Sequence, residues 1–133
     1  MNKLISLLLT IVMLCGLAGM SLADTDEFDF HVTPPNEVFS GTVRKADNEQ
    51  RFYVTTDSIN LKSGDAFWYG PRLGATVMSS GLRITRSSNP RQSYSYSKTA
   101  EPNKYYRLRG NSRLQDITSG SVYQIDASGR WTP

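Results

Sequence analysis

Tyrosines and basic residues occupy every second position of two neighbouring segments of the chain, residues 94–98 and 105–109. If residues 100–103 form the loop of a β-hairpin, side chains of one parity from both segments share a face. That face collects Tyr94, Tyr96, Lys98, Tyr105, Arg107 and Arg109. Tyrosine rings stack on sugars and bases, and guanidinium groups pair with phosphate or carboxylate oxygens. We therefore expect this face to bind an anionic glycan or another polyanion.

Two other arrangements of these residues fit the same pattern. In the hairpin register Tyr96 opposes Arg107 and Tyr94 opposes Arg109, and such cation-π pairs contribute about 0.5 to 1 kcal/mol to an exposed sheet without any ligand. In the third arrangement Tyr94 and Tyr96 face the core, and the serines between them face water. The sequence alone leaves the three arrangements open.

Three consecutive aromatic residues, Phe67, Trp68 and Tyr69, stand directly before Gly70-Pro71. Because side chains alternate between the two faces of a strand, these three cannot all face one core. Either Trp68 or the flanking pair is therefore exposed or covered by another element. Tryptophan is prominent among interface hot spots, so we expect Trp68 to contact a partner. A strand buried on both faces is the alternative.

The segment before Pro34-Pro35 places Phe28, Phe30 and Val32 at every second position. This period of two predicts a half-buried strand, which the two prolines end. An acidic strand of this kind can add to the sheet edge of a neighbouring copy or partner, where Phe28, Phe30 and Val32 would fill pockets. We expect this partner-binding role, and pairing within the chain's own sheet is the alternative.

Residues 1–23 have the features of a secretory signal peptide. Asn2-Lys3 is a short basic start, residues 4–14 are largely apolar, and Ser21-Leu22-Ala23 offers small residues for cleavage. The apolar run is shorter than the roughly 18 residues that a membrane-spanning helix needs. We therefore expect cleavage after Ala23 and export of the mature chain to a periplasm or to the extracellular space.

Few residues of the mature chain suit catalysis. The one cysteine, Cys15, falls inside the expected signal peptide, and His31 is the one histidine. A cysteine nucleophile and a histidine-rich metal site are therefore excluded from the mature chain. Asp29 and His31 share a strand face, but the sequence has no Gly-x-Ser-x-Gly motif and no glycine-rich phosphate loop. We expect no enzymatic activity, no metal and no cofactor.

Four aspartates, Asp57, Asp65, Asp116 and Asp126, could supply the two carboxylates of a glycoside hydrolase. Three of them lie in or beside predicted turns, where aspartate usually serves to form side-chain hydrogen bonds. Asp116 fits the solvent face of a strand that we predict over residues 114–117. We therefore expect structural roles for all four.

Charge is unevenly distributed along the chain. Residues 24–50 contain seven acidic and two basic residues, whereas residues 72–113 contain nine basic residues and one acidic residue. Such asymmetry indicates either a polyanion-binding half or head-to-tail contact between copies. The alternative is that acidic and basic edges only keep a small protein soluble.

The mature chain has the pattern of a β-protein throughout. Short apolar segments recur between turn signals, and no window shows the 3.6-residue period of a helix. Many short strands at regular spacing predict a small antiparallel sandwich or barrel. We therefore divide the chain into a signal peptide at 1–23, an acidic N-terminal strand or extension at 24–36 and a single β-domain at 37–133.

The first predicted hairpin turns at Asp47-Asn48. In that register Val43 faces Phe52 and Gly41 faces Val54, so the apolar residues gather on one side and the threonines on the other. We therefore expect Val43 and Val54 to lie in one hairpin and to face the core.

Residues 119–123, Ser-Gly-Ser-Val-Tyr, resemble a Ser-Gly-x-x-Tyr loop of some small exported lysozyme inhibitors. The resemblance covers these residues alone and does not extend to the cysteines usual in that family. The function we expect is that of an exported, non-catalytic binding module for an anionic glycan or other polyanion. A structural subunit of an envelope or extracellular assembly, and a protein inhibitor of a secreted enzyme, are the alternatives.

Overall fold

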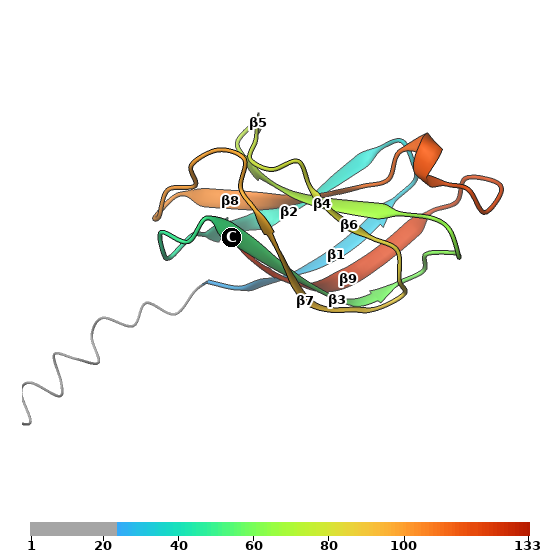
Figure 1. Ribbon diagram of the computed structural model, residues 1–133, viewed down its shortest axis with the longest axis horizontal. Helices are drawn as coiled ribbons and strands as arrows, with labels where there is room; N and C mark the ends of the chain where they lie inside the picture. The colour runs from blue at the N-terminus through green and yellow to red at the C-terminus, as the bar shows by residue number, and fades with distance from the viewer. Residues whose placement is uncertain (1–23) are drawn as a thin grey trace, which may run out of the picture.

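The computed structural model describes residues 24–133, which form two antiparallel β-sheets packed face to face (Figure 1). This confirms the predicted all-β fold, in its sandwich form. The predicted signal peptide and Cys15 lie outside the described residues. Between residues 24 and 133 there is no helix of the length and hydrophobicity needed to cross a bilayer.

Nine strands and one short 3-10 turn make up the described chain. In chain order they are β1 (Asp26–Val32), β2 (Glu37–Arg44), β3 (Arg51–Ile59), β4 (Phe67–Leu73), β5 (Thr76–Val77), β6 (Leu82–Ile84), β7 (Asn89–Ser95), β8 (Tyr105–Asn111), η1 (Leu114–Asp116) and β9 (Ile125–Thr132). Sheet A has the order β1-β9-β3-β7. Sheet B has the order β2-β8-β4-β5, with β6 also paired to β4.

The core lies between the two sheets and is rich in aromatic side chains. The largest apolar and aromatic groups in it are Trp131, Tyr69, Tyr106, Phe30, Phe52 and Phe67, all of them almost completely buried. Each comes from a strand whose alternate residues face outward, as expected for a sandwich with one buried face per sheet. Since residues 24–133 contain no cysteine, packing rather than a disulfide holds the sheets together.

β1 is an edge strand of sheet A and pairs with β9 along its whole length. Phe28, Phe30 and Val32 are 5%, 1% and 5% exposed and belong to the main hydrophobic cluster. The expectation that they fill pockets of a partner is therefore wrong, and the alternative, pairing within the chain's own sheet, is confirmed. Residues 26–32 are part of the sandwich.

The predicted hairpin around Asp47-Asn48 is also wrong. β2 pairs with β8 in sheet B, whereas β3 pairs with β7 and β9 in sheet A. Val43 and Val54 are both buried and both face the core, but they approach it from opposite sheets. The period of two predicted which side chains point inward, and it carries no information about which strand is the hydrogen-bonding neighbour.

A bulge in β2 changes the side-chain alternation within that strand. The pairing with β8 shifts register between Phe39 and Thr42, and an inserted residue of this kind moves the following side chains to the opposite face. Val38 packs against the core, while the ring of Phe39 lies on the outer face beneath the guanidinium of Arg107, at 4.2 Å. Phe39 and Val43, which an unbroken alternation would place on one face, therefore lie on opposite faces of β2.

The second predicted hairpin does not form either. β7 pairs with β3 in sheet A, and β8 lies between β2 and β4 in sheet B. Residues 96–104 connect the two sheets instead of turning tightly within one. Residues 114–116, predicted as part of a strand, form η1, in which the amide of Asp116 donates to the carbonyl of Arg113.

Candidate anion-binding site

The outer face of sheet B carries a row of arginines on two adjacent strands. On β8, Arg107 and Arg109 point outward, and on β4 the outward residues are Trp68, Gly70 and Arg72. Arg72 is directly opposite Arg107, and Gly70 is opposite Arg109. Residues opposite each other in an antiparallel pair have side chains about 4.5 to 5.5 Å apart. The register therefore brings three guanidinium groups together on one surface.

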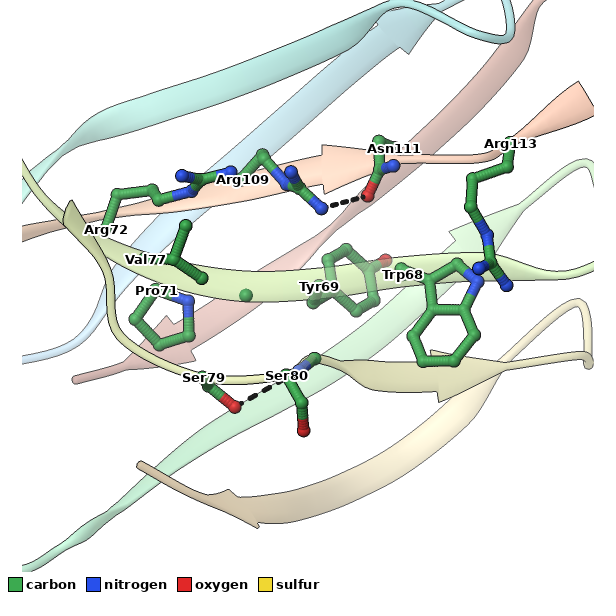
Figure 2. A pocket seen from close by; sticks show the side chains of 12 residues that line it. Trp68, Tyr69, Pro71, Arg72, Val77, Ser79, Ser80, Arg109, Asn111 and Arg113 are labelled. Atoms are coloured by element: carbon green, nitrogen blue, oxygen red, sulfur yellow. Dashed lines mark hydrogen bonds between the residues drawn. The ribbon is translucent and has the colours of Figure 1, made fainter. Parts of the chain in front are cut away.

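A cavity of about 140 Å³ opens on this face above Gly70. Because glycine has no side chain, the outer layer is missing one group between Trp68 and Arg72. Figure 2 shows Arg109 on one side of the cavity and Ser80, from the connection between β5 and β6, on the other. We call this cavity the arginine pocket.

Arg72 is the least satisfied charged group of the arginine pocket. Its side chain is 14% exposed, and its nearest carboxylate, that of Glu37, is 3.9 Å away. Within residues 24–133 its guanidinium makes no hydrogen bond. Burial and the neighbouring charge of Arg109 lower the pKa of Arg72, and Glu37 only partly opposes them. A desolvated cation without hydrogen-bond partners is costly, and an anion bound beside it would remove that cost.

The other two guanidinium groups are held in place by the protein. Arg109 donates to Glu37 at 3.1 Å and to Asn111 at 2.9 Å, the second bond being visible in Figure 2. Arg107 donates to the carbonyl of Gly74 at 3.2 Å, while its buried Nε has no partner among the described residues. Glu37 is the one carboxylate of residues 24–133 that lies within 4 Å of any of the three. This face therefore has an excess of positive charge.

Trp68 forms a rigid aromatic wall at one end of the arginine pocket. Its indole nitrogen donates to Asp116 at 3.1 Å, and the guanidinium of Arg113 lies 5.0 Å from its ring. Arg113 in turn donates to both carboxylate oxygens of Asp116, at 2.9 and 3.1 Å. A ring fixed from two sides loses little freedom on contact with a ligand, which favours binding.

Asp116 is buried, so the prediction that it lies on the solvent face of a strand is wrong. It lies in η1, where the hydrogen bonds of Arg113 and Trp68 compensate its burial. Burial alone would raise the pKa of Asp116, but hydrogen bonds from Arg113 outweigh it and hold the pKa below its ordinary value. Asp116 stays ionised and keeps Trp68 and Arg113 in position.

The six residues predicted to form one ligand face are divided among sheet B, sheet A and the connection between β7 and β8. Arg107, Arg109 and the exposed Tyr105 lie together on the outer face of β8. Tyr94 lies on β7, opposite Phe52, and is 40% exposed. The predicted face of six residues therefore does not exist.

Tyr96 and Lys98 lie beyond the end of β7 and do not line the arginine pocket. Tyr96 is 9% exposed and its ring contacts Phe52 and Tyr106 in the core. For this residue the arrangement with tyrosine in the core and serines facing water is the correct one. Lys98 is exposed in the connection to β8.

Sequence reasoning missed Arg72, Glu37, Asn111, Arg113 and Asp116. Arg72 shares strand parity with Trp68 and Gly70, but this places all three on one face only if the strand continues through Gly70-Pro71, a pair typical of a turn. The contribution of Glu37 depends on β2 lying next to β8, which no local pattern encodes.

A second polar cluster lies on the outer face of sheet A. Nδ1 of His31 lies 2.7 Å from Asp126, and its Nε2 lies 3.4 Å from Asp29. The hydrogen bond with Asp126, and then the charge of Asp29, raise the pKa of His31. Nowhere in residues 24–133 do three or more His, Cys, Asp or Glu side chains form a potential metal site. The contact between His31 and Asp126 therefore connects β1 with β9.

The loop that resembles a lysozyme-inhibitor loop is bound to the body of the protein. Asp65 is fully buried and accepts hydrogen bonds from the backbone and hydroxyl of Ser119, at 2.9 and 2.6 Å, and from the hydroxyl of Tyr123 at 2.7 Å. Thr118 adds a backbone bond of 2.8 Å. The serine and the tyrosine of the Ser-Gly-x-x-Tyr pattern therefore contact the chain's own Asp65, which has the hydrogen-bonding role we expected for it.

The chain matches no protein-family model, no curated protein and no solved structure.

Proposed function

We propose that this chain is an exported, non-catalytic binding protein whose ligand is an anionic glycan or another polyanion, held on the outer face of sheet B. The observation that carries the proposal is Arg72, a largely buried guanidinium without a hydrogen bond among the described residues. Arginine presents several N–H donors in a planar fork that matches carboxylate, sulfate and phosphate oxygens.

The size of the arginine pocket favours a polymer over a small molecule. A volume of about 140 Å³ is well below the roughly 300 to 1,000 Å³ of most small-molecule sites. The pocket therefore takes one charged group of a longer ligand, while Arg107, Arg109 and Tyr105 contact the neighbouring units. Trp68 offers a flat apolar surface to the ring of a sugar. This combination of ring and cations favours an acidic polysaccharide within the wider class of polyanions.

Replacing Arg72 by Gln tests the proposal directly. Binding to heparin and to polygalacturonate should weaken roughly tenfold, since a charge-assisted hydrogen bond contributes about 1.5 to 3 kcal/mol. The slope of affinity against salt concentration should also flatten, because fewer counterions are released. Arg86→Gln is the matched control, since Arg86 is exposed and lies in the connection between β6 and β7. Equal effects of both changes, with intact folds, would overturn the proposal.

The proposed export depends on residues 1–23 and has its own test. Expression of the full chain in a bacterium with a Sec pathway should yield a protein that begins at Asp24, as read by mass spectrometry of the exported fraction. An uncleaved chain in the cytoplasm would contradict it.

Assembly of copies is a second candidate function. Sheet A carries an open groove of about 510 Å³ lined by the acidic residues Glu27, Asp29 and Asp57. This groove is complementary in charge to the arginines of sheet B, and head-to-tail contacts of this type generate open chains. Light scattering over a range of protein concentrations tests it: mass that increases with concentration at low salt supports assembly, and constant monomer mass excludes it.

A further inference from the structure

We propose that the outer face of sheet A holds a second binding site for acidic polysaccharide, so that one molecule bridges two polymer segments. The second site is a groove of about 450 Å³ that is lined by Thr25, Tyr53, Thr55, Arg91, Arg130 and Thr132. We call it the threonine groove. Its volume falls within the range of about 300 to 1,000 Å³ that is usual for small-molecule sites and is ample for a sugar unit.

Arg91 forms one side of the threonine groove. Its guanidinium carbon lies 3.9 Å from the centre of the Tyr53 ring. No hydrogen bond or ion pair links this guanidinium to any other group in residues 24–133. The hydroxyl of Tyr53 donates to Glu49, which fixes the ring. Stacking therefore orients Arg91 and leaves its N–H groups free for an anion.

Arg130 forms the other side. It lies on β9, directly opposite Thr55 of β3. Its one carboxylate contact among the described residues is with Asp57, at 3.5 Å, and both side chains are more than half exposed. Exposed pairs at such distances contribute little to stability, so the guanidinium of Arg130 stays accessible to an incoming carboxylate even though Asp57 and Glu27, its register partner on β1, lie beside it.

The floor of the threonine groove is a row of hydroxyl groups. Thr132 lies opposite Tyr53 in the sheet, and its hydroxyl is 2.7 Å from that of Thr25. Hydroxyls both donate and accept hydrogen bonds, as the hydroxyls of a sugar do. Two arginines flanking such a floor present complementary groups to the hydroxyls and to the carboxylate of a uronic acid unit.

The two sites lie on opposite outer faces of the sandwich, since the arginine pocket is on sheet B and the threonine groove on sheet A. Figure 1 shows the strands of the two sheets. The backbones of packed sheets are about 10 Å apart, and the side chains of each outer face point away from the other sheet. A short oligosaccharide cannot reach both sites at once. Bridging by the protein therefore rests on the proposed function of sheet B, whereas binding at the threonine groove does not.

The test compares a short ligand with a long one. Calorimetry with a short oligogalacturonate should give two binding sites per protein, and mixing with long polygalacturonate should raise light scattering at least tenfold through cross-linking. The double variant Arg91→Gln, Arg130→Gln should retain one site and lose the scattering. The variant Arg72→Gln should lose or weaken the other site and also lose the scattering.

The matched control is Arg86→Gln, Lys98→Gln, which removes two exposed charges outside both sites and should behave as the wild type. One site per wild-type molecule, or unchanged scattering in the Arg91→Gln, Arg130→Gln variant, overturns the inference. If Arg72→Gln leaves both sites intact while the double variant removes one, the proposed function of sheet B fails and bridging through it fails as well. Circular dichroism confirms that each variant is folded.

Discussion

The indole nitrogen of Trp68 donates a 3.1 Å hydrogen bond to the carboxylate of Asp116. This bond connects the aromatic wall of the arginine pocket to the η1 turn, far from Trp68 in the chain and adjacent to it in space. Asp116 need not contact a ligand to affect binding, because it determines where the ring of Trp68 lies. It is a positioning residue for the site on sheet B.

Replacing Asp116 by Ala should lower both stability and affinity. The change leaves the Trp68 indole and the Arg113 backbone amide without their acceptor, so we expect the free energy of unfolding to fall by about 2 kcal/mol. Binding of heparin should weaken severalfold. Urea denaturation and calorimetry measure the two effects. Arg113→Ala keeps the hydrogen bond between Trp68 and Asp116, so it should lower the free energy of unfolding and the affinity for heparin by less than Asp116→Ala does. A larger loss would show that Arg113 is the main support of the ring.

Asp65 should make the protein sensitive to acid. Burial alone would raise the pKa of Asp65, but bonds from Ser119, Tyr123 and Thr118 outweigh it and hold the pKa below the ordinary 3.8. The unfolded chain therefore binds a proton more readily than the folded one, so this stabilisation is complete above about pH 5 and decreases as the pH falls through 3.8 and below. Urea unfolding from pH 6 to pH 2.5 measures it. The variant Asp65→Asn should be less stable than the wild type at pH 6, and its free energy of unfolding should fall less steeply between pH 5 and pH 2.5. An equally steep fall in the variant would contradict this role.

His31 should titrate above its ordinary pKa of 6.5, because Asp126 hydrogen-bonds to it and Asp29 adds negative charge nearby. As the one histidine of the sequence, it gives an unambiguous proton NMR signal. The raised pKa means that the contribution of His31 to stability is present below pH 6.5 and is lost as the pH rises through the folded pKa. In Asp126→Asn the midpoint should move down towards 6.5. A wild-type midpoint at or below 6.5 would show that the contact with Asp126 does not persist in solution.

Gly129 should be essential for sheet A. A Cβ at this position would lie 1.9 Å from the carbonyl oxygen of Thr55. That distance is impossible without moving β3 away from β9, so Gly129→Ala should lower the free energy of unfolding by about 3 kcal/mol or more. Gly41→Ala is the control, because no atom lies within 4 Å of the added carbon, and it should cost less than about 1 kcal/mol. Thermal unfolding of the two variants compares them, and similar melting temperatures would contradict the close approach.

Removal of β1 should unfold the domain. A chain that begins at Asn36 lacks Phe28, Phe30 and Val32, and each fully buried apolar side chain of this size contributes about 1.5 to 3 kcal/mol. Their sum is comparable with the whole stability of a small domain. Circular dichroism and proteolysis of the shortened chain check this. A folded product would show that β1 is dispensable.

The alternation of side chains along each strand was predictable, and the pairing of strands was not. Phe28, Phe52 and Val54 follow a period of two, and each faces the core as that period implies. The same period allows a strand to bond to any neighbour that buries the same face. Both predicted hairpins assumed that strands close in the sequence pair with each other. They are wrong because β2 pairs with β8 and β7 pairs with β3, in each case far away in the chain.

The candidate site was predictable only in part for the same reason. Arg107 and Arg109 share one face by parity alone, and Trp68 was marked by its place among three aromatics. Arg72 joins the site because β4 lies beside β8, a tertiary fact with no local signature. Asp116 was misplaced because a buried carboxylate depends on donors such as Trp68, which is brought to it only by folding.

The pairing of β1 with β9 has a consequence for how the chain is made. The first and last strands of the domain are adjacent in sheet A, and Trp131 of β9 fills part of the core next to β3. A nascent chain that ends before residue 125 lacks the central partner of both β1 and β3. The chain between β1 and β9 closes into a loop only once β9 has been made, and closure over such a long sequence separation is slow. Sheet A therefore cannot assemble until β9 is available to pair with both β1 and β3.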